Sequence, residues 1–184
     1  MEVNRDNFSV TLFSNASTDI YIYNLNSQTS FTNRLALPVD LGSSSDWEVG
    51  PCEISYKPHQ HLIVQGALVD VIGEVNVIVH CNLITPQLVA SELTRLLRTI
   101  ITPSQLGQHL FPNIYYLPVE RNDITSIHIE LSLVDHDRPI VFLNNETQTP
   151  TKVVLHFRRT KWEMLLAGID TFPRNLIDKS IDTR

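Results

Sequence analysis

The chain has 184 residues, of which 42% are hydrophobic and 18% are charged. These values are typical of a single globular domain with a hydrophobic core. The formal net charge of -6 at pH 7 argues against a general nucleic-acid-binding protein, because such proteins carry a basic surface.

The first third of the chain alternates apolar and polar residues, as half-buried strands do. One strand is expected at 7–13. A polar loop follows, and a second strand is expected at 31–37, where Pro38 ends the run. The side chains predicted to face the core are Phe8, Val10, Leu12, Phe31, Leu35 and Leu37.

The stretch 45–56, SDWEVGPCEISY, changes its register halfway along. Trp47 and Val49 point to one side before Gly50-Pro51, and the alternation then resumes on the opposite parity. A β-bulge inserts one residue and bends a strand in this way. The sequence therefore predicts a bulge at Gly50-Pro51, followed by three core-facing side chains, Cys52, Ile54 and Tyr56.

Further strands are expected at 61–73, 75–81, 114–119, 124–135, 139–143 and 152–159. The alternation is cleanest in 127–133, where Ile127, Ile129, Leu131 and Leu133 are the apolar positions. In the last strand the predicted core residues are Val153, Leu155 and Phe157. The density of short strands predicts an antiparallel sandwich.

The segment 85–100, TPQLVASELTRLLRTI, has apolar residues at helical spacing. Thr85 is a good N-cap and Pro86 suits the first helical position. The apolar face would be Val89, Leu93, Leu96, Leu97 and Ile100. The predicted fold is therefore all-β, a single jelly-roll sandwich of about eight antiparallel strands with one short amphipathic helix.

The domain is expected to cover residues 1–160, with a C-terminal tail at 161–184. This tail is unusually apolar for a chain terminus. It either packs on its own domain or docks on a neighbouring subunit. The candidate assembly contacts are Trp162, Met164, Leu165, Leu166 and Phe172.

Cys52 and Cys81 lie in apolar strand-like runs and are expected to be buried free thiols, with a disulfide between them as the alternative. The N-terminal residues lack the pattern of a signal peptide, and no segment is long enough to span a membrane. We therefore expect a protein made inside a cell, without secretion by the usual route and without membrane insertion.

The strongest candidate for a metal site is the pair His59 and His61, which an extended segment would place on one side. A cupin-like site would need a third ligand, and the histidines left to supply it, His128, His136 and His156, have no supporting motif. The run 135–137, DHD, is interpreted as a turn. No nucleophile or phosphate-binding motif is present, so we expect no catalytic residue, no metal and no cofactor.

Arg158, Arg159 and Lys161 form a basic run near the end of the last strand. They could contact nucleic acid or an acidic partner. Charged residues also guard exposed edge strands against pairing with other chains. We favour the second interpretation, with no specific nucleic-acid binding.

Several segments, taken in order and at this spacing, resemble one viral protein family. They are NFSVTLFSNAS, FTNRLALPVDL, WEVGPCEISY, CNLITPQLVA, YYLPV and LHFRR. Together they resemble the minor capsid, or penton, proteins of Maverick/Polinton elements and of related virophage-like and adintovirus-like viruses. The resemblance covers roughly 7–159. Its best-matched residues, Trp47, Glu48, Val49, Glu53 and Ile54, are interpreted as fold and packing residues.

The resemblance implies a single jelly roll that forms homopentamers at the vertices of an icosahedral virion, beside a double jelly-roll major capsid protein. Two other functions stay open. One is a receptor- or carbohydrate-binding module, whose sign would be exposed loop aromatics such as Tyr21, Tyr23 or Tyr56. The other is the cupin-like metal enzyme that would use His59 and His61.

Overall fold

The computed structural model describes residues 6–26, 29–42, 46–56, 61–64, 67–70, 74–89, 91–103, 107–133, 136–139, 141–142 and 149–160. The described residues form strands and loops and contain no α-helix.

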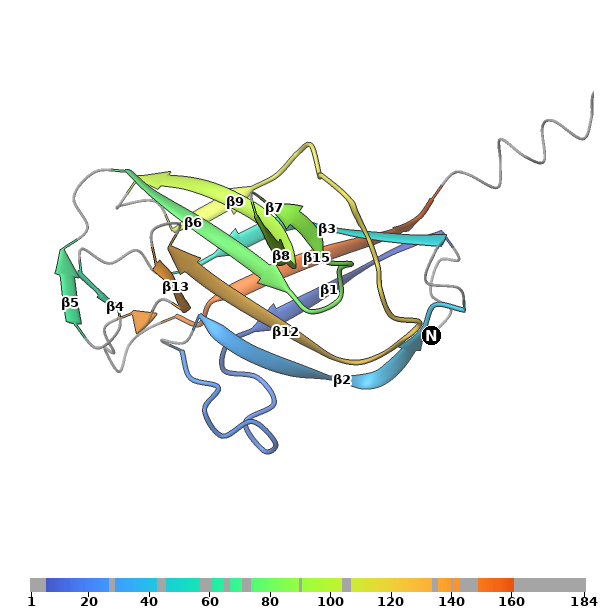
Figure 1. Ribbon diagram of the computed structural model, residues 1–184. Coiled ribbons are helices and arrows are strands. Elements are labelled where there is room, and N and C mark those ends of the chain that lie inside the picture. Colours follow the sequence, from blue (N-terminus) through green and yellow to red (C-terminus); the bar gives the residue numbers. More distant parts are fainter. Residues whose placement is uncertain are drawn as a thin grey trace, which may run out of the picture.

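Two antiparallel sheets of five strands each pack as a sandwich (Figure 1). The first sheet has the order β1 (Asn7–Phe13), β15 (Lys152–Arg159), β3 (Trp47–Ser55) and β10 (Gln108–Leu110), and β11 (Leu117–Pro118) also pairs with β3. The second sheet contains β2 (Ser30–Asp40), β12 (Asp123–Leu133), β6 (Glu74–Cys81) and β9 (Leu96–Pro103), with β13 (His136–Pro139) paired to the end of β12.

Two smaller sheets complete the described structure. Three short strands pair at one end of the sandwich (Figure 1): β4 (His61–Val64), β5 (Ala67–Asp70) and β14 (Val141–Phe142). A hairpin between β6 and β9 consists of β7 (Gln87–Val89) and β8 (Glu92–Thr94).

The strand order interleaves early and late parts of the chain in both sheets. The last long strand, β15, lies between β1 and β3, and β12 lies between β2 and β6. This arrangement is consistent with a jelly-roll-like sandwich. It gives the molecule two flanks, one bounded by the edge strands β1 and β2 and the other by β9 and β10 (Figure 1).

The core lies between the two sheets and is formed by the alternation that the sequence shows. Leu155 and Phe157 of β15 and Ile127 and Ile129 of β12 are completely buried, which confirms these predictions. Leu37 was expected in the core, but its side chain is 73% exposed. The reason is a register irregularity in β2, described below with the surface that it creates.

The bulge predicted in β3 is confirmed, but it lies one residue beyond Gly50-Pro51. Leu155 is opposite Pro51 and Val154 is opposite Glu53, so Cys52 is the extra residue. Because it occupies the bulge, Cys52 is half-buried instead of joining the core as predicted, whereas Ile54 and Tyr56 are buried.

Gly50 has a different role from the one predicted. The connection between β10 and β11, which both pair with β3, passes close to this residue. A Cβ atom at Gly50 would overlap the carbonyl oxygen of Tyr115 and come within 2.6 Å of Ile114 Cγ2. Glycine is therefore required here for the close approach of a second backbone segment.

The predicted amphipathic helix at 85–100 is wrong. This segment forms β7, β8 and the first part of β9. β9 pairs with β6, and Leu97 is an extra residue opposite the step from Val79 to His80. The bulge spaces the buried Leu97 and Ile100 three residues apart, which imitates a helical pattern.

Two smaller expectations are also decided by the fold. Cys52 and Cys81 are both free, as predicted. Cys81 is completely buried, and burial raises the pKa of its thiol to about 12.

The interpretation of the last strand as an edge is wrong, because β15 pairs with β1 on one side and β3 on the other.

Candidate assembly surfaces

The candidate residues chosen from the sequence are largely outside the described part of the chain. The tail contacts Trp162, Met164, Leu165, Leu166 and Phe172 all lie there, as does His59. Within the described ranges, no group of three or more His, Cys, Asp or Glu side chains is arranged to hold a metal ion.

Large apolar side chains are exposed on two opposite flanks of the sandwich. We call the first the β2 flank, defined by Phe13, Ile20, Ile22, Tyr23, Leu25 and Leu37. We call the second the β9 flank, defined by Leu88, Val89, Leu93, Ile101, Leu110 and Tyr115. These twelve are all of the strongly exposed large apolar residues in the described ranges.

The β2 flank is built around the loop that joins β1 to β2. The buried side chain of Asn24 fixes this loop, because its Nδ2 donates to the carbonyl oxygens of Ala16 and Thr32, at 2.5 and 2.7 Å. Ser17 has a φ of 57° and its Oγ accepts a hydrogen bond from Arg34 N at 2.9 Å. The loop thus presents Ile22 and Tyr23, 68% and 79% exposed, from a fixed base.

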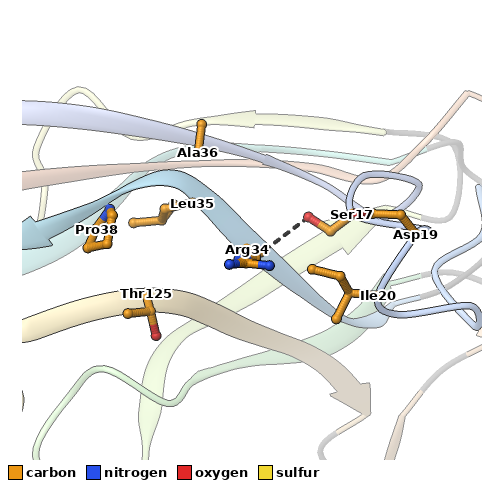
Figure 2. A pocket seen from close by; sticks show the side chains of 8 residues that line it. All are labelled: Ser17, Asp19, Ile20, Arg34, Leu35, Ala36, Pro38 and Thr125. Carbon is orange, nitrogen blue, oxygen red and sulfur yellow. Dashed lines mark hydrogen bonds between the residues drawn. The ribbon is translucent and has the colours of Figure 1, made fainter.

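A cavity of about 270 Å³ lies between this loop and β2. The cavity exists because β2 separates from β12 over a few residues. Arg34 is opposite Ser126 and Val39 is opposite Ile124. Residues 35–38 of β2 therefore bend away from β12, where only Thr125 lies opposite them. Figure 2 shows the residues that line it: Ser17, Asp19, Ile20, Arg34, Leu35, Ala36, Pro38 and Thr125.

The β9 flank is built around the hairpin β7–β8. Gln87 Nε2 donates to the carbonyl oxygen of Leu96 at 3.2 Å, and Thr94 Oγ1 lies 3.2 Å from His80 Nδ1. These bonds hold the base of the hairpin against the edge of the second sheet. The side chains of Leu88 and Leu93 are 71% and 75% exposed on it.

The outer face of the first sheet is polar and internally paired, in contrast to the flanks. Lys152 Nζ lies 2.6 Å from Glu53 Oε1, and the hydrogen bond from this ammonium group lowers the pKa of the Glu53 carboxyl. Arg158 pairs with Glu48 at 2.9 Å and lies over the ring of Tyr116.

The outer face of the second sheet is polar in the same way. His128 Nδ1 lies 2.9 Å from Thr32 Oγ1. His128 Nε2 lies 3.9 Å from Glu130 Oε2, and the nearby imidazole of His128 lowers the pKa of the Glu130 carboxyl. Because these charged groups on both faces already have partners, the apolar flanks are the better surfaces for contact with another protein.

The basic run of β15 is also occupied within the chain. Arg158 is paired with Glu48, and the guanidinium of Arg159 lies 5.6 Å from the centre of the Trp47 ring. Lys161 lies outside the described residues.

Of the loop aromatics considered from the sequence, Tyr23 is 79% exposed, whereas Tyr56 is buried against His109.

The sequence reasoning missed most of the β2 flank, because it treated the residues after β1 as a polar loop. The available signal was the run Ile20-Tyr21-Ile22-Tyr23, which is apolar but has no alternation. It missed the β9 flank because it assigned Leu93 to the buried face of a helix.

No protein-family model, no curated protein and no solved structure gives a significant match to this chain. The resemblance to penton proteins therefore stays a prediction. No helix within the described ranges has the length and hydropathy needed to cross a bilayer.

Proposed function

We propose that this protein is a non-enzymatic structural subunit of a virion, a single jelly roll of which five copies form a closed ring at each vertex of an icosahedral capsid. The observation that carries the proposal is the presence of two different apolar flanks on opposite sides of one sandwich.

Two different flanks suit a ring for a geometric reason. A symmetric dimer uses one self-complementary patch twice, whereas a ring joins two unlike patches head to tail. The β2 flank is a loop with a cavity, and the β9 flank is a projecting hairpin. Their difference in shape favours the head-to-tail arrangement over the symmetric dimer.

The resemblance supports the fivefold number and the partner. Proteins of the penton family form pentamers at the fivefold vertices, and a double jelly-roll major capsid protein fills the other positions of the capsid. The apolar residues Trp162, Met164, Leu165, Leu166 and Phe172 would give the tail a place in the same assembly, on a neighbouring subunit.

The solution mass of the full chain tests this function. Five chains of 21.0 kDa have a mass of about 105 kDa, and light scattering should find this species either for the protein alone or after co-expression with a major capsid protein. A chain that is monomeric in both preparations would overturn the proposal.

A carbohydrate-binding module is the second candidate, and the exposed ring of Tyr23 favours it. Aromatic faces often bind sugars by stacking, and this ring is 79% exposed on a fixed loop. Binding of the full chain to a glycan array, lost in Tyr23→Ala and kept in Tyr115→Ala, would support this function. Absence of glycan binding would count against this second candidate.

A further inference from the structure

The cavity on the β2 flank has the size of a side-chain socket. Its volume of about 270 Å³ is below the range of about 300–1,000 Å³ that is usual for small-molecule pockets. Ile20, Leu35 and Pro38 provide apolar walls, and Thr125 of β12 lies at its far side (Figure 2). One or two leucine side chains would fill such a space.

The hairpin β7–β8 lies on the opposite flank. Its two exposed leucine side chains have a size that would fit into the cavity. Leu88 and Leu93 are opposite each other in the hairpin register and project side by side. Both are more than 70% exposed. Gln87 and Thr94 fix the hairpin at its base, so that little conformational entropy would be lost when it docks.

One charge beside each surface could pair with the other. The exposed guanidinium of Arg34 lines the cavity together with the exposed carboxylate of Asp19, and the exposed carboxylate of Glu92 is next to Leu93. Within the described part of the chain, neither group has an ion-pair partner. An Arg34–Glu92 pair between two molecules would give each charge its partner while the apolar parts are buried.

We infer that the hairpin β7–β8 of one molecule inserts Leu93 and Leu88 into the cavity beside Arg34 of a second copy of the same chain. This inference rests on the proposed ring and names the contact that closes it. The hairpin and the cavity lie on opposite flanks of one sandwich, so the hairpin of a molecule cannot reach the cavity of the same molecule. The occupant is therefore a second copy, and each copy contributes one hairpin and one cavity.

Disulfide trapping tests this contact directly. In the full chain, Ala36→Cys and Leu93→Cys are introduced together, and the oxidised protein is analysed on a non-reducing gel. Two cysteines form a disulfide only when their Cα atoms are within about 7 Å. The double variant should form a covalent ladder, whereas Ala36→Cys alone and Leu93→Cys alone should not.

The matched control pairs Leu93→Cys with Thr11→Cys, an exposed position on the outer face of β1. This combination should give no ladder. The native thiols are the same in all variants, so any background from Cys52 is measured in the unmodified chain.

Charge reversal provides a second measurement. Arg34→Glu and Glu92→Arg should each weaken self-association roughly three- to tenfold, as expected for an exposed ion pair, and the double reversal should restore most of the loss. Circular dichroism of each variant verifies that the fold is kept.

The outcomes separate this contact from the proposed function. A ladder that ends at five chains supports both, whereas a ladder in an assembly of another size supports the contact and counts against a fivefold ring. A pentamer without the ladder, or with no response to charge reversal, overturns the contact and leaves the function standing. A chain without self-association and without a ladder overturns the contact as well.

Discussion

The side chain of Asn33 forms two hydrogen bonds with the backbone of Phe13. Its Oδ1 accepts from Phe13 N at 2.8 Å, and its Nδ2 donates to the Phe13 carbonyl oxygen at 2.9 Å. Asn33 belongs to β2 in the second sheet and Phe13 to β1 in the first. One amide group thus imitates a strand partner and joins the two sheets along the β2 flank.

Removal of this amide should destabilise the sandwich. Asn33 is 4% exposed, and Asn33→Ala leaves a backbone donor and a backbone acceptor without partners at a partly buried place. The expected loss in the free energy of unfolding is about 2–4 kcal/mol, measured by urea denaturation. Asn76→Ala, at an exposed position of β6, should cost less than about 0.5 kcal/mol. Equal effects of the two substitutions would contradict the bridging role.

Gly50 and Gly42 should respond differently to alanine, because the structure needs them for different reasons. At Gly50 the added Cβ meets the backbone of Tyr115, so that Gly50→Ala should cost about 2 kcal/mol or more. At Gly42 nothing lies within 4 Å, but φ is +71°, so Gly42→Ala should cost about 1 kcal/mol.

Chemical denaturation of the two glycine variants measures both effects. Gly42→Asn should recover part of the loss at Gly42, since asparagine tolerates this backbone conformation. Gly50→Asn should be no better than Gly50→Ala. A Gly50→Ala variant as stable as the parent would show that the connection through Tyr115 leaves room for a side chain at Gly50.

The strands could be predicted from the sequence where the chain alternates without interruption. Ile127 and Ile129 of β12 and Leu155 and Phe157 of β15 follow strict period two, and all four are buried. The bulge in β3 was also visible, because its change of parity is a local signal. Its position at Cys52 depends on the pairing with β15, which the local pattern does not contain.

The helix prediction failed because β9 also contains a bulge. Leu97 and Ile100 are spaced as on a helix only because Leu97 is the extra residue opposite β6. The β-branched run 99–102 favours a strand, and the helix prediction did not take it into account. In the fold, Thr85 N instead donates to the carbonyl oxygen of Pro118.

The candidate surfaces could be predicted least, because exposure depends on partners distant in the sequence. Leu37 alternates correctly for a core residue, yet β2 separates from β12 at that point. Nothing in residues 35–38 alone indicates this separation. The cavity between Arg34 and Thr125 is likewise a consequence of strand register.

The stability should decline as the pH falls below about 6.5. Burial lowers the pKa of His109, and burial together with the nearby charge of Arg158 lowers the pKa of His156. Both residues thus take up protons more readily in the unfolded chain. Their contribution is complete above the unfolded pKa and is lost as the pH falls from that value toward the folded pKa.

Urea denaturation at about pH 7.5 and about pH 5.5 measures this dependence. His109→Gln and His156→Gln should each reduce the difference between the two free energies of unfolding, and the double variant should reduce it further. A difference that stays unchanged in the double variant would assign the pH dependence to other groups.

The tail should be necessary for assembly and dispensable for the fold. The described ranges end with Thr160, whose N donates to the carbonyl oxygen of Asp46 at 2.7 Å, so we expect a chain that ends at residue 160 to keep both sheets. We expect this truncated chain to have the strand spectrum of the parent in circular dichroism but to lose the species of about 105 kDa. Light scattering of the two chains at equal concentration provides the comparison.

A second variant separates the apolar contacts of the tail from its length. In the full chain, Trp162→Ser together with Phe172→Ser removes the two largest candidate contacts, whereas Arg174→Ser with Lys179→Ser changes two charged positions of the same tail. The first pair should weaken assembly more than the second, because buried aromatic side chains contribute most at protein interfaces. Assembly that survives both truncation and the aromatic pair would remove the tail from the interface and leave the two flanks of the sandwich as the whole of it.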